Sequence, residues 1–191
     1  MRDYTEINRI IKAGGVVLLP TETVYGLACS AVDAQAVQKI YAMKGRDFQK
    51  PLAVCVRDLE MAQRFGVFSP KAADLAKRYW PGSLTLVVEA KQNISIDSNC
   101  QSKLGQTATI AFRCPEAYWL NHLDGPLALT SANRSGEKEC TSFTVAASEF
   151  GEDIDAGLET DIPLSGLPST IISIVDEDFK ILRQGTLKVS L

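Results

Sequence analysis

Apolar residues recur at the spacing of helix faces in several segments of this chain. The isoleucines of residues 7–11 share one face of a short helix, which the pair Gly14-Gly15 would end. The same pattern predicts further helices over residues 34–41, 70–79 and 117–120. For the first of these three, Asp33 is a suitable N-cap and Gly45 lies just past the end.

Short apolar runs between turn-forming residues predict the strands of a sheet. The first run, Val16 to Leu19, is stopped by Pro20. Further strands are predicted at 52–56, 84–88, 109–112, 127–129, 170–175 and 179–182. The final pair resembles a hairpin around residues 176–178, and the polar stretch 89–106 is predicted to be a surface loop. Because strands and helices alternate, we expect one α/β domain over residues 1–191, with a twisted, mostly open sheet of mixed parallel and antiparallel strands flanked by helices.

Composition and charge narrow the class of protein without naming a function. The chain has 191 residues, of which 46% are hydrophobic and 23% charged, as in an ordinary soluble domain. Its longest apolar run, at 16–19, is far too short to span a bilayer, and residues 1–4 lack the apolar core of a secretory signal. We therefore expect a cytoplasmic protein with no membrane association. The net charge of −3 is not typical of a nucleic-acid-binding protein, although it leaves room for a local basic cleft.

The cysteines and the histidine argue against a metal centre. The five cysteines are spread along the chain without a Cys-x-x-Cys pair, at Cys29, Cys55, Cys100, Cys114 and Cys140. That spacing favours neither a disulfide framework nor a zinc ribbon. His122 is the single histidine, whereas a Ser or Cys nucleophile usually needs a histidine partner. We expect no protein-bound metal, and we expect His122 to be a surface or capping residue.

The first candidate for a ligand site is the segment Pro20 to Gly26, which follows the predicted strand at 16–19. In open α/β sheets ligands bind beyond the carboxyl ends of strands, so the threonine hydroxyls of this segment suit a small polar substrate. The alternative is a plain strand-to-turn connection in which threonine and glycine serve the backbone.

The second candidate is a cluster of cations between a helix and a strand. Lys44, Arg46 and Lys50 combine the point charge of lysine with the planar fork of arginine, a set that suits phosphate recognition. Cations near a helix C-terminus also complement the helix dipole, with Gly45 ending the helix, so that explanation stays open. The cluster is not a P-loop, because no glycine-rich run ends in Gly-Lys-Ser/Thr.

The third candidate is the predicted strand at 127–129, where it runs into Ser131 and Asn133. Hydroxyl, amide and backbone N–H groups converge there in a way that suits an oxyanion or a nucleotide. The alternative is a helix N-cap or an Asx turn. Arg113 and Arg183 add cations at the ends of two predicted strands, where they could equally be solvated surface charges.

Together these segments resemble the YrdC-like domain family. The resemblance rests on six motifs that follow one another in the family's order: Pro20-Thr-Glu-Thr-Val-Tyr-Gly-Leu27, Lys44-x-Arg46 with Lys50-Pro-Leu52, Trp80-Pro-Gly82 with Thr85, Ser131-Ala-Asn133 with Ser135-Gly136, Pro168-Ser-Thr-Ile171 and Leu182-Arg183-x-Gly185. The chain looks like the short, single-domain form. The resemblance implies a YrdC-like (DHBP synthase-like) fold with a large, concave, cationic cavity.

The resemblance also implies a reaction and its participants. It implies an L-threonylcarbamoyladenylate synthase, a nucleotidyltransferase that converts L-threonine, bicarbonate (or CO2) and ATP to threonylcarbamoyl-AMP and pyrophosphate. Mg²⁺ would travel with ATP, and no tightly bound metal or organic cofactor is implied. The product would pass to a tRNA threonylcarbamoyl transferase complex, which modifies the adenosine beside the anticodon.

The resemblance also implies the site residues, most of which lie within the six motifs. The implied catalytic residues are Lys44 and Arg46. The residues implied for L-threonine and bicarbonate are Thr23, Arg113 and Ser169. The residues implied for ATP are Arg46, Lys50, Thr109, Ser131, Asn133 and Arg183.

Some positions depart from the family pattern, and two other functions stay open. Residues 136–140, Gly-Glu-Lys-Glu-Cys, replace a segment with proline and serine that helps to hold nucleotide in the family. One alternative function is a YrdC-like module that binds double-stranded RNA, tRNA or nucleotide without catalysis. The other is a related domain that makes carbamoyl-adenylate for hydrogenase maturation, normally within a much longer chain. The intact patterns at 21–23 and 131–133 favour the synthase.

Overall fold

The computed structural model describes residues 4–175 and 178–189, and its strands form one connected sheet. In spatial order the sheet runs β11-β10-β5-β7-β3-β8-β2-β1-β9, with β4 paired to β5 and β6 to β7. The strands are β1 Val17–Pro20, β2 Tyr25–Ser30, β3 Ala53–Cys55, β4 Gly66–Val67, β5 Leu84–Ala90, β6 Gln101–Leu104, β7 Thr107–Arg113, β8 Leu127–Ser131, β9 Ala156–Gly157, β10 Thr170–Val175 and β11 Asp178–Arg183. Parallel and antiparallel pairs are mixed, as predicted: β1 with β9, β3 with β7 and β5 with β10 are parallel.

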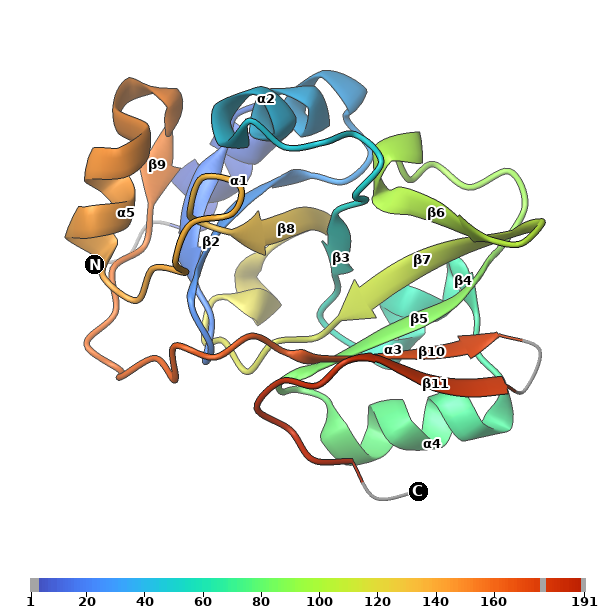
Figure 1. Cartoon of the computed structure of the whole chain (residues 1–191). Coiled ribbons are helices and arrows are strands. Elements are labelled where there is room, and N and C mark those ends of the chain that lie inside the picture. Colours follow the sequence, from blue (N-terminus) through green and yellow to red (C-terminus); the bar gives the residue numbers. More distant parts are fainter. Residues whose placement is uncertain (1–3, 176–177, 190–191) are drawn as a thin grey trace.

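Helices flank the sheet on two sides. They are α1 Tyr4–Lys12, α2 Ala34–Lys44, α3 Leu59–Gln63, α4 Pro70–Tyr79 and α5 Phe143–Phe150, with 3-10 turns η1 Ser98–Cys100, η2 Leu120–His122 and η3 Gly151–Asp153. Figure 1 shows α1, α2 and α5 gathered beside β1, β2 and β9, whereas α4 lies beside β10 and β11. None of the helices in the described ranges is long and apolar enough to cross a membrane.

Local capping signals explain why the long helices begin and end where they do. The predictions at 34–41 and 70–79 are confirmed by α2 and α4. The Asp33 carboxylate accepts hydrogen bonds from two backbone N–H groups in the first turn of α2. Gly45 ends that helix in the left-handed conformation, with φ of 58°. In α4 the hydroxyl of Ser69 accepts the capping hydrogen bond.

The helix predicted at 117–120 is wrong. The chain there enters the 3-10 turn η2 from an irregular stretch that contains Pro115. Proline lacks an N–H and pushes the residue before it out of the helical region. The indole of Trp119, which is fully buried, donates to the backbone oxygen of Pro20 at 2.6 Å. A tertiary contact, not a helix face, therefore explains the apolar residues of this segment.

All the predicted strands have counterparts in the structure, and one predicted loop differs from it. The predictions at 16–19, 52–56, 84–88, 109–112 and 127–129 correspond to β1, β3, β5, β7 and β8, and β10 pairs with β11 as the predicted hairpin. Residues 176–177 of that hairpin lie outside the described residues. The surface loop predicted at 89–106 is wrong in part, because β6 pairs with β7 and the side chains of Ile96 and Cys100 are buried.

Strand β2 was not predicted, because Gly26 suggested a turn. A Cβ at this glycine would lie 2.7 Å from Cδ1 of Leu129 in the neighbouring strand β8. The glycine therefore serves close packing between two strands, which is a second common use of glycine in sheets. Helices α3 and α5 were not predicted either.

The register of the sheet brings several strand ends to one place. β7 pairs in parallel with β3, which sets Arg113 opposite Cys55, and antiparallel with β5, which sets Arg113 opposite Thr85. β2 pairs with β8 so that Gly26 lies opposite Ser131. Polar and cationic side chains from distant parts of the sequence therefore meet around the middle of the sheet.

Candidate active site

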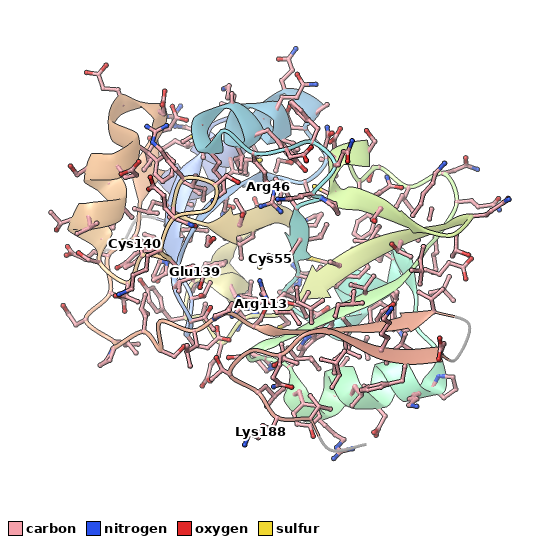
Figure 2. The ribbon with its side chains drawn as sticks, viewed as in Figure 1. Arg46, Cys55, Arg113, Glu139, Cys140 and Lys188 are labelled. Carbon is pink, nitrogen blue, oxygen red and sulfur yellow. The ribbon has the colours of Figure 1, made fainter. Side chains whose placement is uncertain are left out.

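A cavity of about 210 Å³ lies where these strand ends meet. Four stretches of chain supply much of its wall: 21–26, 51–53, 129–131 and 168–171. The charged side chains that line it are Arg46, Arg113, Arg183 and Glu139. Figure 2 shows Arg46, Arg113 and Glu139 converging on this region from three separate parts of the chain. Three guanidinium groups against one carboxylate suit the cavity to anionic ligands.

The predicted ligand segment after β1 is a turn held by its own threonines. Thr21 Oγ1 donates to the backbone oxygen of Val24 at 2.7 Å and lies 2.8 Å from Thr23 Oγ1. Because the Thr21 proton is already used, the Thr23 hydroxyl donates to Thr21 and keeps its lone pairs for another donor. That donor is Nη2 of Arg113, at 2.9 Å from Thr23 Oγ1. The hydroxyl of Thr23 is therefore fixed in the cavity wall.

Arg113 is a firmly held cation of the cavity. Its Nη2 also donates to Glu22 Oε1 at 2.8 Å, and the Ser83 hydroxyl donates to the same carboxylate oxygen at 2.9 Å. Arg113 is 8% exposed, and its buried Nε has no hydrogen-bond partner within the described chain. A guanidinium that lines a cavity and is oriented by an acidic residue is suited to bind a carboxylate.

Lys44 ties the end of α2 to the segment after β8. Its ammonium donates to the backbone oxygens of Ser131 and Asn133. The residue is 3% exposed, and burial together with the positive charge of Arg46 lowers the pKa of Lys44 to about 8. Ser131 lines the cavity, so Lys44 supports this part of the wall from behind.

Arg183 is held across the other side of the cavity by Ser169. Its Nε and Nη2 donate to the Ser169 backbone oxygen at 3.1 and 2.9 Å, and the Ser169 hydroxyl lies 2.8 Å from Thr85 Oγ1. Gly185 makes this arrangement possible, because a Cβ there would lie 2.2 Å from the backbone oxygen of Pro168. The glycine of the Leu-Arg-x-Gly motif is therefore a packing requirement.

The structure brings most of the predicted site residues together. Those in the cavity wall are Thr23, Arg46, Arg113, Ser131, Ser169 and Arg183. Lys44 and Asn133 lie directly behind the wall. Lys50 is exposed and is not part of the wall, although its backbone oxygen accepts a hydrogen bond from Arg46 Nε at 2.9 Å. Thr109 is buried on the same face of β7 as Arg113 and is also not part of the wall.

Sequence reasoning missed Glu22, Thr85 and Glu139 as parts of the site. Glu22 stands between the two threonines of the first motif, and nothing in the sequence indicated that it pairs with Arg113, 91 positions away. Thr85 lies next to the Trp-Pro-Gly motif and contacts Ser169. Glu139 gave no signal that it faces the cavity, because it lies in the segment that departs from the family pattern.

Other residues that could carry chemistry lie elsewhere or are inactive. Within residues 4–175 and 178–189, no group of three or more His, Cys, Asp and Glu side chains is placed to hold a metal ion. His122 is exposed and stacks on Tyr4 with ring centroids 4.1 Å apart, which confirms it as a surface residue. Burial raises the pKa of the Cys55 thiol, so this cysteine is not a ready nucleophile.

The fold and the cavity define a class of protein. It is an α/β protein whose curved, mixed sheet holds a polar, arginine-lined cavity. Comparison with known proteins supplies the particular family. Residues 9–185 match the Sua5/YciO/YrdC family, described as "Telomere recombination", and the chain belongs to that family.

Relatives and solved structures agree with this assignment. A Pyrococcus abyssi protein named threonylcarbamoyl-AMP synthase is 35% identical over 93% of this chain and 52% of its own length. A Bacillus subtilis protein of the same name is 36% identical over 92% of this chain and 51% of its own length. The crystal structure of P. abyssi Sua5 complexed with L-threonine superimposes with a TM-score of 0.85, at 32% identity, over 95% of this chain and 54% of that one. The chain therefore spans about half the length of these relatives.

Proposed function

We propose that this protein is a threonylcarbamoyl-AMP synthase, a nucleotidyltransferase, and that residues 1–191 act as one YrdC-like domain. The observation that carries the proposal is a single cavity that holds an oriented carboxylate-binding arginine, Arg113, together with two further arginines, Arg46 and Arg183. The names of the B. subtilis and P. abyssi relatives support the same activity. So does the threonine complex of a structurally similar protein.

L-Threonine would bind on the Arg113 side of the cavity. The Arg113 guanidinium would take the substrate carboxylate, because Glu22 and Thr23 already fix its orientation. The hydroxyls of Thr23 and Ser169 line the same wall and could hold the remaining polar groups of the amino acid. Bicarbonate would bind nearby, between the arginines.

The first chemical step would form a carbamate. The neutral threonine amine attacks the carbon of CO2, forms a C–N bond and releases one proton to solvent. With bicarbonate the same C–N bond forms, the C–O bond to hydroxide breaks, and the amine proton leaves with that hydroxide as water. Carbamates of this kind readily revert, and a cavity that excludes water and supplies cations favours the anion.

The second step would transfer an adenylyl group. A carbamate oxygen attacks the α-phosphorus of ATP, the bond to the β-phosphate oxygen breaks, and pyrophosphate leaves with that electron pair. This step needs positive charge around the phosphates more than it needs a strong base. Arg46 and Arg183 would supply that charge from the wall, with Lys44 and the exposed Lys50 contributing from outside it.

The remaining predicted contacts concern the nucleotide and the fate of the product. Ser131, Asn133 and Thr109 are proposed to position ATP, which would enter with Mg²⁺. We propose that the protein acts in the cytoplasm and passes its product to a tRNA threonylcarbamoyl transferase complex. Contact with tRNA or double-stranded RNA at the same cationic surface would be salt-sensitive.

The test is pyrophosphate release from ATP, with and without L-threonine and bicarbonate. We expect release that requires both co-substrates and that falls about 10- to 100-fold in Arg46→Ala, which removes a cation from the cavity wall. Arg64→Ala is the matched control, because Arg64 is an exposed arginine whose partner is the exposed Glu60. Folded protein without threonine-dependent release would disprove the synthase. A non-catalytic nucleotide- or RNA-binding module would then be the better account.

A further inference from the structure

Glu139 is an acidic side chain in the wall of an otherwise cationic cavity. Among the described residues that line the cavity, it is the one carboxylate beside three arginines. It is half-buried, whereas its neighbours Glu137 and Lys138 are exposed. Its carboxylate has no hydrogen bond or ion pair to any described residue. Its charge is therefore available to whatever occupies the cavity.

The backbone on both sides of Glu139 is anchored. Nδ2 of Asn133 donates to the backbone oxygen of Glu137 at 2.7 Å. The N–H of Tyr25, at the start of β2, donates to the backbone oxygen of Cys140 at 2.9 Å. Figure 2 shows Glu139 and Cys140 on the segment that passes beside β2 and β8. The backbone therefore holds Glu139 in a fixed position in the cavity wall.

Glu139 lies close to cations that we expect to attract the phosphates of ATP. Its negative charge acts on Lys44 and on Arg183, and it raises the pKa of each against the lowering effect of burial. A triphosphate that contacts Arg183, which lines the cavity, would also lie close to this carboxylate. Like charges at close range in a partly buried site repel strongly.

We infer that Glu139 shifts the preference of this cavity from metal-free nucleoside triphosphate toward its magnesium complex. The inference rests on the proposed function. Free ATP carries two more negative charges than its magnesium complex, so the carboxylate repels the free form more. Mg²⁺ usually keeps several waters and binds through substrate phosphates with one or two carboxylates, a demand that a single Glu139 fits. The carboxylate can also accept hydrogen bonds from water molecules that are bound to the metal.

The test compares two binding constants in three proteins. Calorimetry measures the affinity for ATP with EDTA and for ATP with saturating Mg²⁺, in the absence of threonine so that no turnover occurs. The variant is Glu139→Gln, which keeps the shape of the side chain and removes the charge. The matched control is Glu137→Gln, because Glu137 is an exposed glutamate of the same segment outside the wall.

We expect the wild type and Glu137→Gln to have the same ratio of affinity for the magnesium complex to affinity for metal-free ATP. In Glu139→Gln, metal-free ATP should bind about tenfold more tightly, the magnesium complex should gain less because it carries less negative charge, and the ratio should fall by about threefold. The difference should shrink at high salt, because the repulsion is electrostatic. An unchanged ratio in Glu139→Gln would overturn the inference.

Failure of the proposed function gives a different result. Threonine-dependent pyrophosphate release from the same wild-type preparation tests the proposed synthase activity separately. If release is present and the ratio does not change, only the role of Glu139 is wrong. If folded wild type neither binds nucleotide nor releases pyrophosphate, the proposed function and this inference both fail.

Discussion

Buried charge distinguishes this site at the scale of single residues. Lys44 and Arg113 are 3% and 8% exposed, and buried cations are rare unless they are paired. Arg113 has a carboxylate partner in Glu22. Lys44 has backbone oxygens instead, which satisfy its hydrogen bonds without neutralising its charge. That difference explains why burial lowers the pKa of Lys44 so far.

The lowered pKa predicts how stability depends on pH. Between about 8, the pKa of Lys44 in the folded protein, and its ordinary value of 10.5, the unfolded chain binds more protons than the folded one. The contribution of this residue to the free energy of unfolding therefore rises with pH through that window. We expect the wild-type value minus that of Lys44→Met, from urea unfolding, to increase between these two pH values. The subtraction cancels the buried cysteines, and a flat or falling difference would contradict the assignment.

At the scale of elements, the hairpin of β10 and β11 positions one side of the cavity. It brings Arg183, at the end of β11, back onto Ser169, just before β10. The chain can close this contact because Gly185 packs directly against the Pro168–Ser169 backbone. The hairpin residues were predictable from apolar runs, but this close approach was not, because it depends on how two strand ends meet.

A side chain at Gly185 should force these strand ends apart. We expect Gly185→Ala to lower the free energy of unfolding by about 1–3 kcal/mol and to weaken ATP binding by displacing Arg183. Gly125→Ala is the control, because nothing lies within 4 Å of a Cβ at that position. Urea unfolding and calorimetric titration with ATP measure the two effects. Equal behaviour of the two variants would contradict the proposed packing role.

At the scale of the whole molecule, the curvature of the sheet creates the cavity. β1 and β7 are separated in the sheet by β3, β8 and β2. Nevertheless Glu22, which follows β1, contacts Arg113 at the end of β7 at 2.8 Å. The sheet must therefore curl enough for its two sides to touch, and Figure 1 shows the strands turning around this region. The ion pair joins the two sides beside the proposed threonine site.

Loss of this cross-sheet ion pair should affect threonine more than ATP. In Glu22→Gln the neutral amide no longer holds the Arg113 guanidinium in place, and we expect about tenfold weaker binding of L-threonine. ATP binding should stay within a few-fold of wild type, since the change adds no negative charge to the cavity. Glu116→Gln, at an exposed glutamate outside the wall, is the control. Calorimetric titration with each substrate alone measures the contrast, and unchanged threonine binding would contradict this role for Glu22.

Local signals in the sequence predicted most of the elements. The caps Asp33 and Gly45 mark the ends of α2, and apolar runs mark seven of the strands. These signals work because helix caps and side-chain periodicity depend on residues a few positions apart. They failed at 117–120, where burial of Trp119 against Pro20 is a contact across 99 positions.

The sequence alone indicated which residues belong to the site, but it did not determine where they lie relative to the cavity. The order of motifs indicated a resemblance to the family, and that resemblance implied Thr23, Arg46, Arg113, Ser131, Ser169 and Arg183, which the structure brings to one cavity. Only the tertiary structure decided that Lys44 supports the wall from behind, that Lys50 lies outside it and that Glu139 lies within it. The physical reason is distance along the chain: Glu22 and Arg113 are 91 positions apart, so their contact depends on the curvature of the whole sheet.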